Sequence, residues 1–436
     1  MRTPSARPRR RWHGGADIAE MPPVATKSLS VVFNSVQHTL EAPAQDSSSK
    51  LTRQPTAAAA RLPIIDVARG SAALMVCALH AREIVWVGLR SCLSQRGHEP
   101  FFQTALGVLS APLALGGTAV PLFFVISGYC IHRSFAAKLA ADPDHEPHWR
   151  AYFIRRAWRI YPVLIAVLLI TLLLDQFTVH RYPQDEKLGS LSMGTMLVNL
   201  CALQGLAGPP FGSNGPLWSL SVEMQLYALY PVIFYLVKRL GMKTSLLMTL
   251  AVSMVCAAVG AFSKFGALVW FGPFWFSWTL GCAVAELENS KIRMTLEPIK
   301  FIAWFLIGAL GFALCLSRFS TFAFSCVACF WAVIILKCLR ARVANSSLLP
   351  LTLMAKLGVI SYSLYAVHKP VVLFARSLFF QATPSRNILF VPLVMAGCVL
   401  VASALFFLVE RYSLRVPPWL RISSERGAGS CATAAE

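Results

Sequence analysis

Charged side chains are scarce in this sequence, and acidic ones are the scarcest. Asp, Glu, Lys and Arg make up 14% of the 436 residues, and only 20 residues are Asp or Glu. An ordinary globular domain carries about 25% charged residues. Together with a hydrophobic content of 56%, this shortage excludes a soluble globular fold.

The chain also lacks a pattern of paired cysteines. Its 12 cysteines are spread singly and fall mostly in apolar stretches, so we expect no disulfide framework. Cys326 and Cys329 form a C-x-x-C inside an apolar run, where small residues serve to pack helices together. His145 and His148 share an acidic loop without further ligands nearby. We therefore predict no metal site.

Long apolar runs are abundant. A helix needs about 20 apolar residues to cross the hydrocarbon core of a bilayer, and uninterrupted runs of this length do not fit the two-residue alternation of a barrel strand. The sequence therefore predicts an all-α polytopic membrane protein with about ten transmembrane helices. The expected spans are 66–89, 108–131, 160–177, 217–237, 244–262, 267–287, 299–317, 320–337, 356–379 and 388–410.

The basic residues predict the orientation of these spans. The formal net charge is +20, which in a soluble protein would suggest a nucleic-acid partner. With a cytoplasmic N-terminus, however, most of the 40 Lys and Arg residues fall in cytoplasmic segments, as the positive-inside rule requires. We therefore expect the lipid bilayer and no nucleic acid as partner, and both termini in the cytoplasm. The weakly apolar stretch 191–206 is interpreted as interfacial or re-entrant.

Three parts of the chain are distinguished by composition. Residues 1–60 are rich in Arg, Pro, Ser and Ala and lack a sustained apolar stretch, which predicts a disordered basic cytoplasmic extension. Residues 61–412 form the transmembrane domain. Residues 413–436 form a short cytoplasmic tail. Nothing in the sequence predicts the oligomeric state.

Ionisable residues inside spans are costly, which makes them candidates for function. Arg69 and His80 in the first span are eleven positions apart, about three turns, so they share a helix face and lie about 16 Å apart along the axis. Asp66 is one turn before Arg69 on the same stripe. The alternative is a histidine satisfied by a neighbouring helix and an arginine that reaches for the interface.

Two further clusters follow. In YFIRRAWRIYP, Arg156 and Arg159 share a face at i, i+3, and paired guanidinium groups suit bidentate binding of phosphates. A plain positive-inside anchor is the alternative.

In GPLWSLSVEMQLYALYP, Glu223 lies two turns into an apolar helix and needs a partner, for which an Arg or His of another cluster is the obvious candidate. The alternative is a partly solvated carboxylate. Its neighbours are Trp218, Ser219 and Ser221.

The remaining candidates are scattered over three spans. The segment LGVISYSLYAVHKP places Ser361, Tyr365 and His368 on one side of a helix. Ser127 in VISGY is not part of a G-x-S-x-G nucleophile elbow, so it is not interpreted as a hydrolase serine. Glu410 closes the last span.

These pieces resemble the acyltransferase-3 family of multi-pass membrane O-acyltransferases, which includes bacterial O-antigen and exopolysaccharide acetylases. The matching motifs occur in family order over roughly residues 62–412. They are IDVARGSAALMVCALH, GTAVPLFFVISGY, RRAWRIYP, WSLSVEMQLY, ISYSLYAVHKP and the closing VER.

The resemblance implies a function and roles for the candidate residues. Family members use cytoplasmic acyl-CoA, usually acetyl-CoA, so acyl-CoA is expected as donor substrate, with no permanently bound cofactor. His80 is then the catalytic base or carries the acyl group itself. Arg69, Arg156 and Arg159 bind the donor's phosphates, and Glu223 orients His80 or binds the acceptor. Asp66, Ser127, Trp218, Ser219, Ser221, Ser361, Tyr365, His368 and Glu410 contact substrate or support the site.

The expected reaction is O-acylation, most simply O-acetylation, of a carbohydrate or glycoconjugate hydroxyl at the bacterial inner membrane. Three other classes stay open. A transporter or flippase for a saccharide or lipid-linked substrate also places charges in mid-membrane, but it consumes no acyl-CoA. A structural or receptor-like protein does not need an aligned Arg–His face. The separate family of membrane-bound acyltransferases that act on lipids and proteins also uses an intramembrane histidine, but the flanking motifs fit it less well.

Overall fold

The computed structural model describes residues 63–94, 101–262, 271–289, 298–315, 317, 320–341 and 348–415. The predicted extension 1–60 and most of the tail 413–436 lie outside these residues. Within them the fold is all-α and contains no strand, only two isolated bridges. This agrees with the predicted fold class and has a simple cause: in lipid, a helix satisfies every backbone polar group within its own segment.

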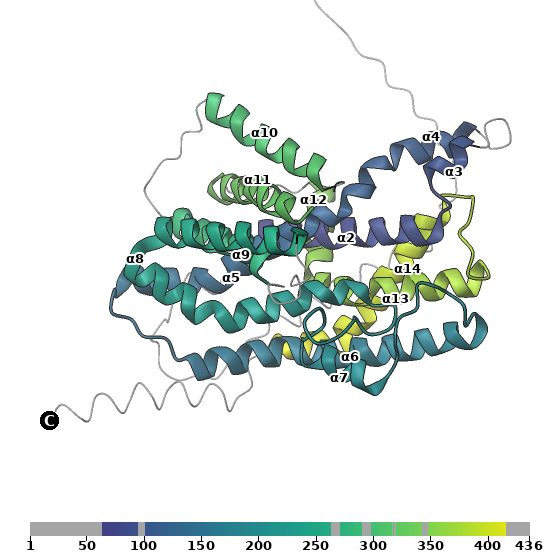
Figure 1. The fold of residues 1–436 in the computed structure, drawn as a ribbon, viewed down its shortest axis with the longest axis horizontal. Helices are drawn as coiled ribbons and strands as arrows, with labels where there is room; N and C mark the ends of the chain where they lie inside the picture. The colour runs from purple at the N-terminus through teal and green to yellow at the C-terminus, as the bar shows by residue number, and fades with distance from the viewer. Residues whose placement is uncertain are drawn as a thin grey trace, which may run out of the picture. The chain divides into compact units, whose positions relative to one another are not determined.

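The helices follow the apolar runs, with some shifts at their ends (Figure 1). Their order is α2 (Pro63–Val85), α3 (Leu89–Ser94), α4 (Phe101–Leu109), η2 (Ala111–Thr118), α5 (Ala119–Ala141), α6 (Trp149–Arg181), α7 (Met193–Leu200), η3 (Gly215–Leu217), α8 (Trp218–Phe262), α9 (Gly272–Asn289), α10 (Pro298–Leu314), α11 (Ser320–Arg340), α12 (Leu349–Val359), α13 (Ser361–Phe379), α14 (Phe390–Leu405), the π-helical turn η6 (Phe406–Glu410) and α15 (Arg411–Ser413).

The predicted number of spans is not confirmed. Six helices of the described residues are long and apolar enough to cross a membrane, or seven if the bent pair α12–α13 is one span. α8 contains two of the predicted spans, separated by a break at Gly241, whose φ of 79° ends the first helix. α9 ends in the polar residues Glu286, Glu288 and Asn289, and the apolar helix Ile302–Leu314 of α10 is short.

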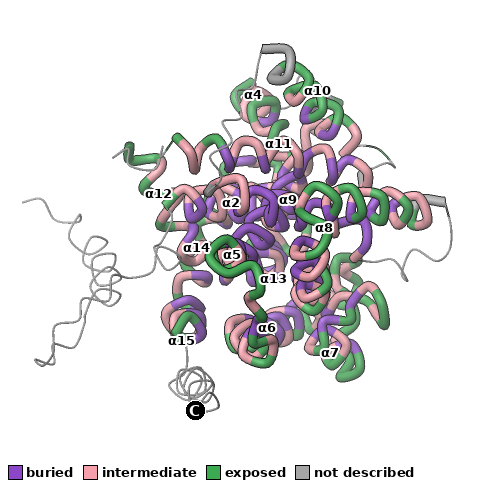
Figure 2. The backbone as a smooth tube through the Cα atoms, turned by 90° about the vertical axis from the view of Figure 1, so that its left-hand side faces the viewer, coloured by how far each residue is buried: buried purple, intermediate pink, exposed green. Residues whose placement is uncertain are grey.

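The surface of the described helices is that of a membrane protein. Leu173, Leu400 and Leu408 are 71%, 72% and 73% exposed. Soluble proteins rarely expose large apolar patches, whereas a surface that faces lipid is apolar. Burial is concentrated on α2, α5, α9 and α13, whereas α4, α7 and α10 are mostly exposed or half-buried (Figure 2). With its eight residues, α7 is too short to span the membrane, consistent with an interfacial 191–206 segment.

Helix α2 is at the centre because it packs against α5, α12, α13 and α14. Its residues Ile65, Ala72 and Val76 belong to one apolar core, made mainly with α5, α8, α9 and α11. Ala73 and Ile84 belong to a second core, made with α6, α13 and α14. Different residues of α2 therefore pack into each of the two apolar cores.

Candidate active site

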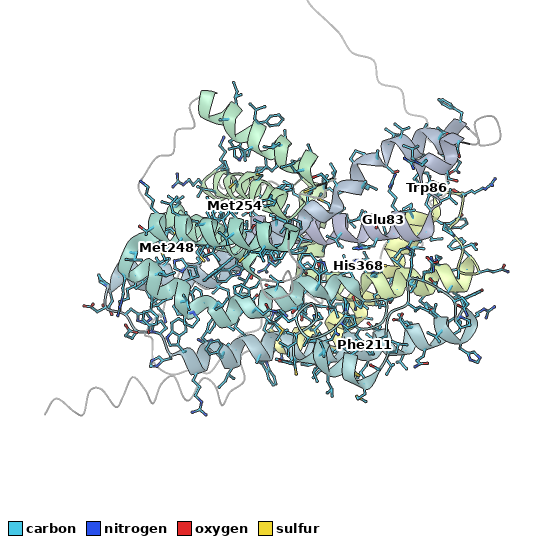
Figure 3. All side chains as sticks on the ribbon, in the orientation of Figure 1. Glu83, Trp86, Phe211, Met248, Met254 and His368 are labelled. Carbon is cyan, nitrogen blue, oxygen red and sulfur yellow. The ribbon has the colours of Figure 1, made fainter. Side chains whose placement is uncertain are left out.

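Two histidines from distant parts of the sequence meet between α2 and α13. His368 Nε2 lies 3.0 Å from His80 Nδ1, and the ring centroids are 5.0 Å apart at a tilt of 43°. His368 is fully buried and His80 half-buried. Figure 3 shows His368 close to α2, with Glu83 further along that helix and Trp86 just after its end. The sequence suggested both residues but did not pair them.

The hydrogen bonds assign the protons of this pair. His368 Nδ1 lies 2.7 Å from the Tyr365 carbonyl oxygen, which can only accept, so this nitrogen carries the proton and Nε2 of the neutral ring accepts. His80 Nδ1 faces two acceptors at 3.0 Å, His368 Nε2 and the Val76 carbonyl, so it also carries a proton. The lone pair of His80 is thereby left on Nε2. No residue that the structure describes donates to it, and it is free to act as a base.

Glu223 and Ser127 belong to a chain of hydrogen bonds that links α5, α8 and α9. Trp278 Nε1 donates to Ser127 Oγ at 3.2 Å, Ser127 Oγ donates to the Tyr227 hydroxyl at 3.1 Å, and Tyr227 donates to Glu223. Sequence reasoning missed Tyr227, although its position one turn after Glu223 on the same face was a usable signal. It also missed Trp278, for which the sequence offered none.

Two arginines gather around Tyr227. The Arg156 guanidinium carbon lies 5.8 Å from the ring centres of both Tyr152 and Tyr227, and its buried Nε has no hydrogen-bond partner among the described residues. Arg69 donates to Cys130 Sγ at 3.2 Å and interacts electrostatically with Tyr227 and Glu223. We call Arg69, Arg156, Glu223 and Tyr227 the arginine cluster.

The hydrogen-bond partners of His80 and Glu223 therefore differ from those that the sequence suggested. Glu223 was suggested to orient His80, but the described hydrogen bond of its carboxylate goes to Tyr227, and His368 holds the His80 ring. The physical reason is distance along α2. Arg69, which belongs with Glu223, is about three helical turns from His80.

Arg159 is held apart from Arg156. Its Nη2 lies 2.7 Å from Glu410 Oε1, and its Nη1 donates to Ser413 Oγ at 3.3 Å. Glu410 is fully buried and also accepts hydrogen bonds from Ser363 N at 3.2 Å and Ser363 Oγ at 2.5 Å. Arg159 and Glu410 thus join α6 to α13 and the last helix, and the two arginines do not form one bidentate clamp.

The other candidates from the sequence mainly fasten segments together. The hydroxyls of Ser219 and Tyr365 lie 2.6 Å apart, Ser221 Oγ donates to the Ala202 carbonyl at 2.5 Å, and Ser361 Oγ donates to the Gly358 carbonyl at 2.8 Å. Trp218 packs against Phe274 and Phe324. Asp66 Oδ1 lies 3.9 Å from Arg69 Nη1. No group of three or more metal-ligating side chains occurs in the part of the chain that the structure describes.

A family model described as an acyltransferase domain matches residues 62–407. The chain belongs to the acyltransferase-3 family. The matched range includes His80, His368 and the whole arginine cluster, and only the closing VER at 409–411 lies just beyond it. Neither a curated protein nor a solved structure matches the chain. As a family member with several apolar helices, it is an integral membrane acyltransferase.

Proposed function

We propose that this acyltransferase-3 protein is an O-acyltransferase that moves an acyl group, acetyl in the simplest case, from acyl-CoA to a hydroxyl of a carbohydrate or glycoconjugate. The observation that carries the proposal is the free Nε2 of His80, on a ring that the Val76 carbonyl and His368 hold in one tautomer. O-acylation needs such a base because an alcohol is a poor nucleophile until its proton is removed.

The reaction follows from this base. His80 Nε2 takes the proton of the acceptor hydroxyl as its oxygen attacks the thioester carbonyl carbon, and the carbonyl electron pair moves to oxygen. When the tetrahedral intermediate collapses, the carbon–sulfur bond breaks and the imidazolium returns the proton to the CoA sulfur. His368 accepts the hydrogen bond from His80 Nδ1 throughout, which keeps Nε2 aimed at the substrate and stabilises the positive charge of the imidazolium.

The donor is placed by the arginine cluster. Arg69 lies about 16 Å from His80 along α2, about the length that an extended CoA needs to bring its thioester to the base. We propose that Arg69 and Arg156 bind the phosphates of CoA, that Tyr227, bonded to Glu223, keeps the Arg156 guanidinium in place, and that Asp66 and Cys130 do so for Arg69. By the positive-inside rule this end of α2 faces the cytoplasm, where acyl-CoA is available. The membrane is then the bacterial inner membrane.

A thiol-release assay tests the proposal. Purified protein in nanodiscs receives acetyl-CoA together with extracted lipopolysaccharide or exopolysaccharide, and free CoA is measured over time. We expect CoA release that depends on the acceptor, with acetyl ester appearing on the polysaccharide. The alternative outcome has three parts: the protein does not bind acetyl-CoA, it releases no CoA, and it moves labelled saccharide across a vesicle membrane. This outcome would identify a transporter instead.

The different surroundings of Arg156 and Arg159 lead to a prediction. Arg156→Met should raise the KM for acetyl-CoA by about 10- to 100-fold, because a charge-assisted hydrogen bond contributes about 1.5–3 kcal/mol, and it should leave the unfolding temperature nearly unchanged. Arg159→Met should instead lower the unfolding temperature, since it leaves the buried Glu410 unpaired. Kinetics and thermal unfolding of both variants in detergent decide the matter. Equal donor KM values for Arg156→Met and the unmodified chain would remove Arg156 from the donor site.

A further inference from the structure

Lys369 is a half-buried cation next to the histidine pair. It directly follows His368 on α13, and its ammonium lies beside the backbone of Gly215, where a β-carbon would come within 3.0 Å of Nζ. Among the residues described, it forms no hydrogen bond and no ion pair. A charge within a span is costly unless it is paired or serves a function, so the missing partner requires an explanation.

The opposite charges that act on Lys369 do not supply a partner. Lys369 interacts electrostatically with Asp175 and Glu83, but neither carboxylate forms an ion pair with it. Asp175 already accepts from Ser213 N at 2.6 Å and from Ser213 Oγ at 2.8 Å. Glu83 is exposed at the far end of α2.

The loop that faces Lys369 is held firmly. Asn214 Nδ2 donates to the Ala366 carbonyl at 2.9 Å and to Thr171 Oγ1 at 3.1 Å. These bonds fix the loop to α13 and α6 immediately before Gly215. Gly215 lets the ammonium approach the backbone, because a β-carbon at this position would lie only 3.0 Å from Nζ. The backbone that the ammonium faces is therefore held in place by the fold.

We infer that Lys369 binds oxygen atoms of the saccharide acceptor and holds its hydroxyl against His80. The inference rests on the proposed function and adds the side from which the acceptor comes. The arginine cluster lies toward the start of α2, three turns before His80. Lys369 interacts with His80 and with Glu83, which lies beyond His80 on α2. Donor and acceptor thus reach the base from opposite ends of α2. An ammonium suits the acceptor because it offers three donors to hydroxyl or carboxylate oxygens.

Steady-state kinetics of Lys369→Met in nanodiscs test this inference, with acetyl-CoA as donor and extracted lipopolysaccharide or exopolysaccharide as acceptor. We expect the KM for the polysaccharide to rise by about 10- to 100-fold, while the dissociation constant of acetyl-CoA changes less than about twofold. Retained acetyl-CoA binding also reports that the variant is folded. Lys369→Arg, which keeps the charge, should recover part of the loss.

Lys187→Met is the matched control. Lys187 is an exposed lysine that interacts electrostatically with Lys369, and the acceptor KM should change less than about twofold because solvent screens an exposed charge. An equal loss in both variants would show that only net charge matters and would overturn the inference, as would a Lys369→Met variant in which the donor alone binds more weakly. If the unmodified chain itself releases no CoA with either polysaccharide, the proposed function fails and the inference with it.

Discussion

Replacing His80 by alanine should slow acyl transfer by at least about 100-fold while the protein still binds acetyl-CoA. The variant removes the only imidazole nitrogen of the His80–His368 pair that is left free, because Nε2 of His368 is occupied by His80 and its Nδ1 by the Tyr365 carbonyl. A positioned general base contributes about 10²- to 10⁴-fold to the rate, and we expect a loss in this range. Acceptor-dependent CoA release measures it.

Binding of acetyl-CoA should survive because the arginine cluster is three turns away. Isothermal titration with acetyl-CoA checks this point and shows that the variant is folded. His148→Ala is the matched control, since His148 is an exposed loop residue whose side chain makes no capping hydrogen bond; it should transfer at the unmodified rate. Full activity of folded His80→Ala protein would falsify the assignment of His80 as base.

Replacing Gly128 by alanine should strongly destabilise the helix bundle, although it adds only one methyl group. A β-carbon at Gly128 would lie 1.9 Å from the Trp278 carbonyl oxygen on α9, and one at Gly281 would lie 2.0 Å from the Val125 carbonyl oxygen on α5. The two helices thus approach backbone to backbone through two glycines, as small residues allow in membranes. Room for a methyl group requires α5 and α9 to separate.

Overpacking of this kind costs about 1–3 kcal/mol and more where the backbone must move, so we expect at least about 3 kcal/mol and a clear fall in the thermal unfolding temperature. Separation of the helices would also stretch the Trp278–Ser127 hydrogen bond next to Gly128, so activity should fall with stability. Gly397→Ala on α14 is the control, since a β-carbon there meets nothing within 4 Å. It should be neutral or slightly stabilising, because alanine favours a helix over glycine by roughly 0.5–1 kcal/mol. Equal unfolding temperatures for both variants would refute the close packing.

Much of the fold was predictable because lipid imposes local rules. An apolar run must be a helix whatever surrounds it, so the all-helical class and most helix positions followed from hydropathy alone. The number of spans did not follow. Two predicted spans lie within the single element α8, one on each side of the break at Gly241, while the polar end of α9 and the short apolar part of α10 leave these two helices less apolar or shorter than a membrane span.

Hydropathy and charge along the chain were enough to single out the residues that are costly enough to be functional. Arg69, His80, Arg156 and Glu223 stand out because a charged or polar group in a span is expensive in any tertiary context. The spacing of Arg69 and His80 was also informative, since 3.6 residues per turn places these two residues on one face of α2.

Which of these groups meet depends on how the helices pack in three dimensions. His80 is held by a residue 288 positions away. Among the described residues, Arg156 finds no ion-pair partner while Arg159 binds Glu410, and Lys369 lies beside Gly215 without an ion pair. Each outcome depends on how neighbouring helices are rotated and shifted, and one residue along a helix turns a side chain by about 100°. Local sequence sets the cost of a buried polar group, but the packing of helices far apart in the chain sets its partner.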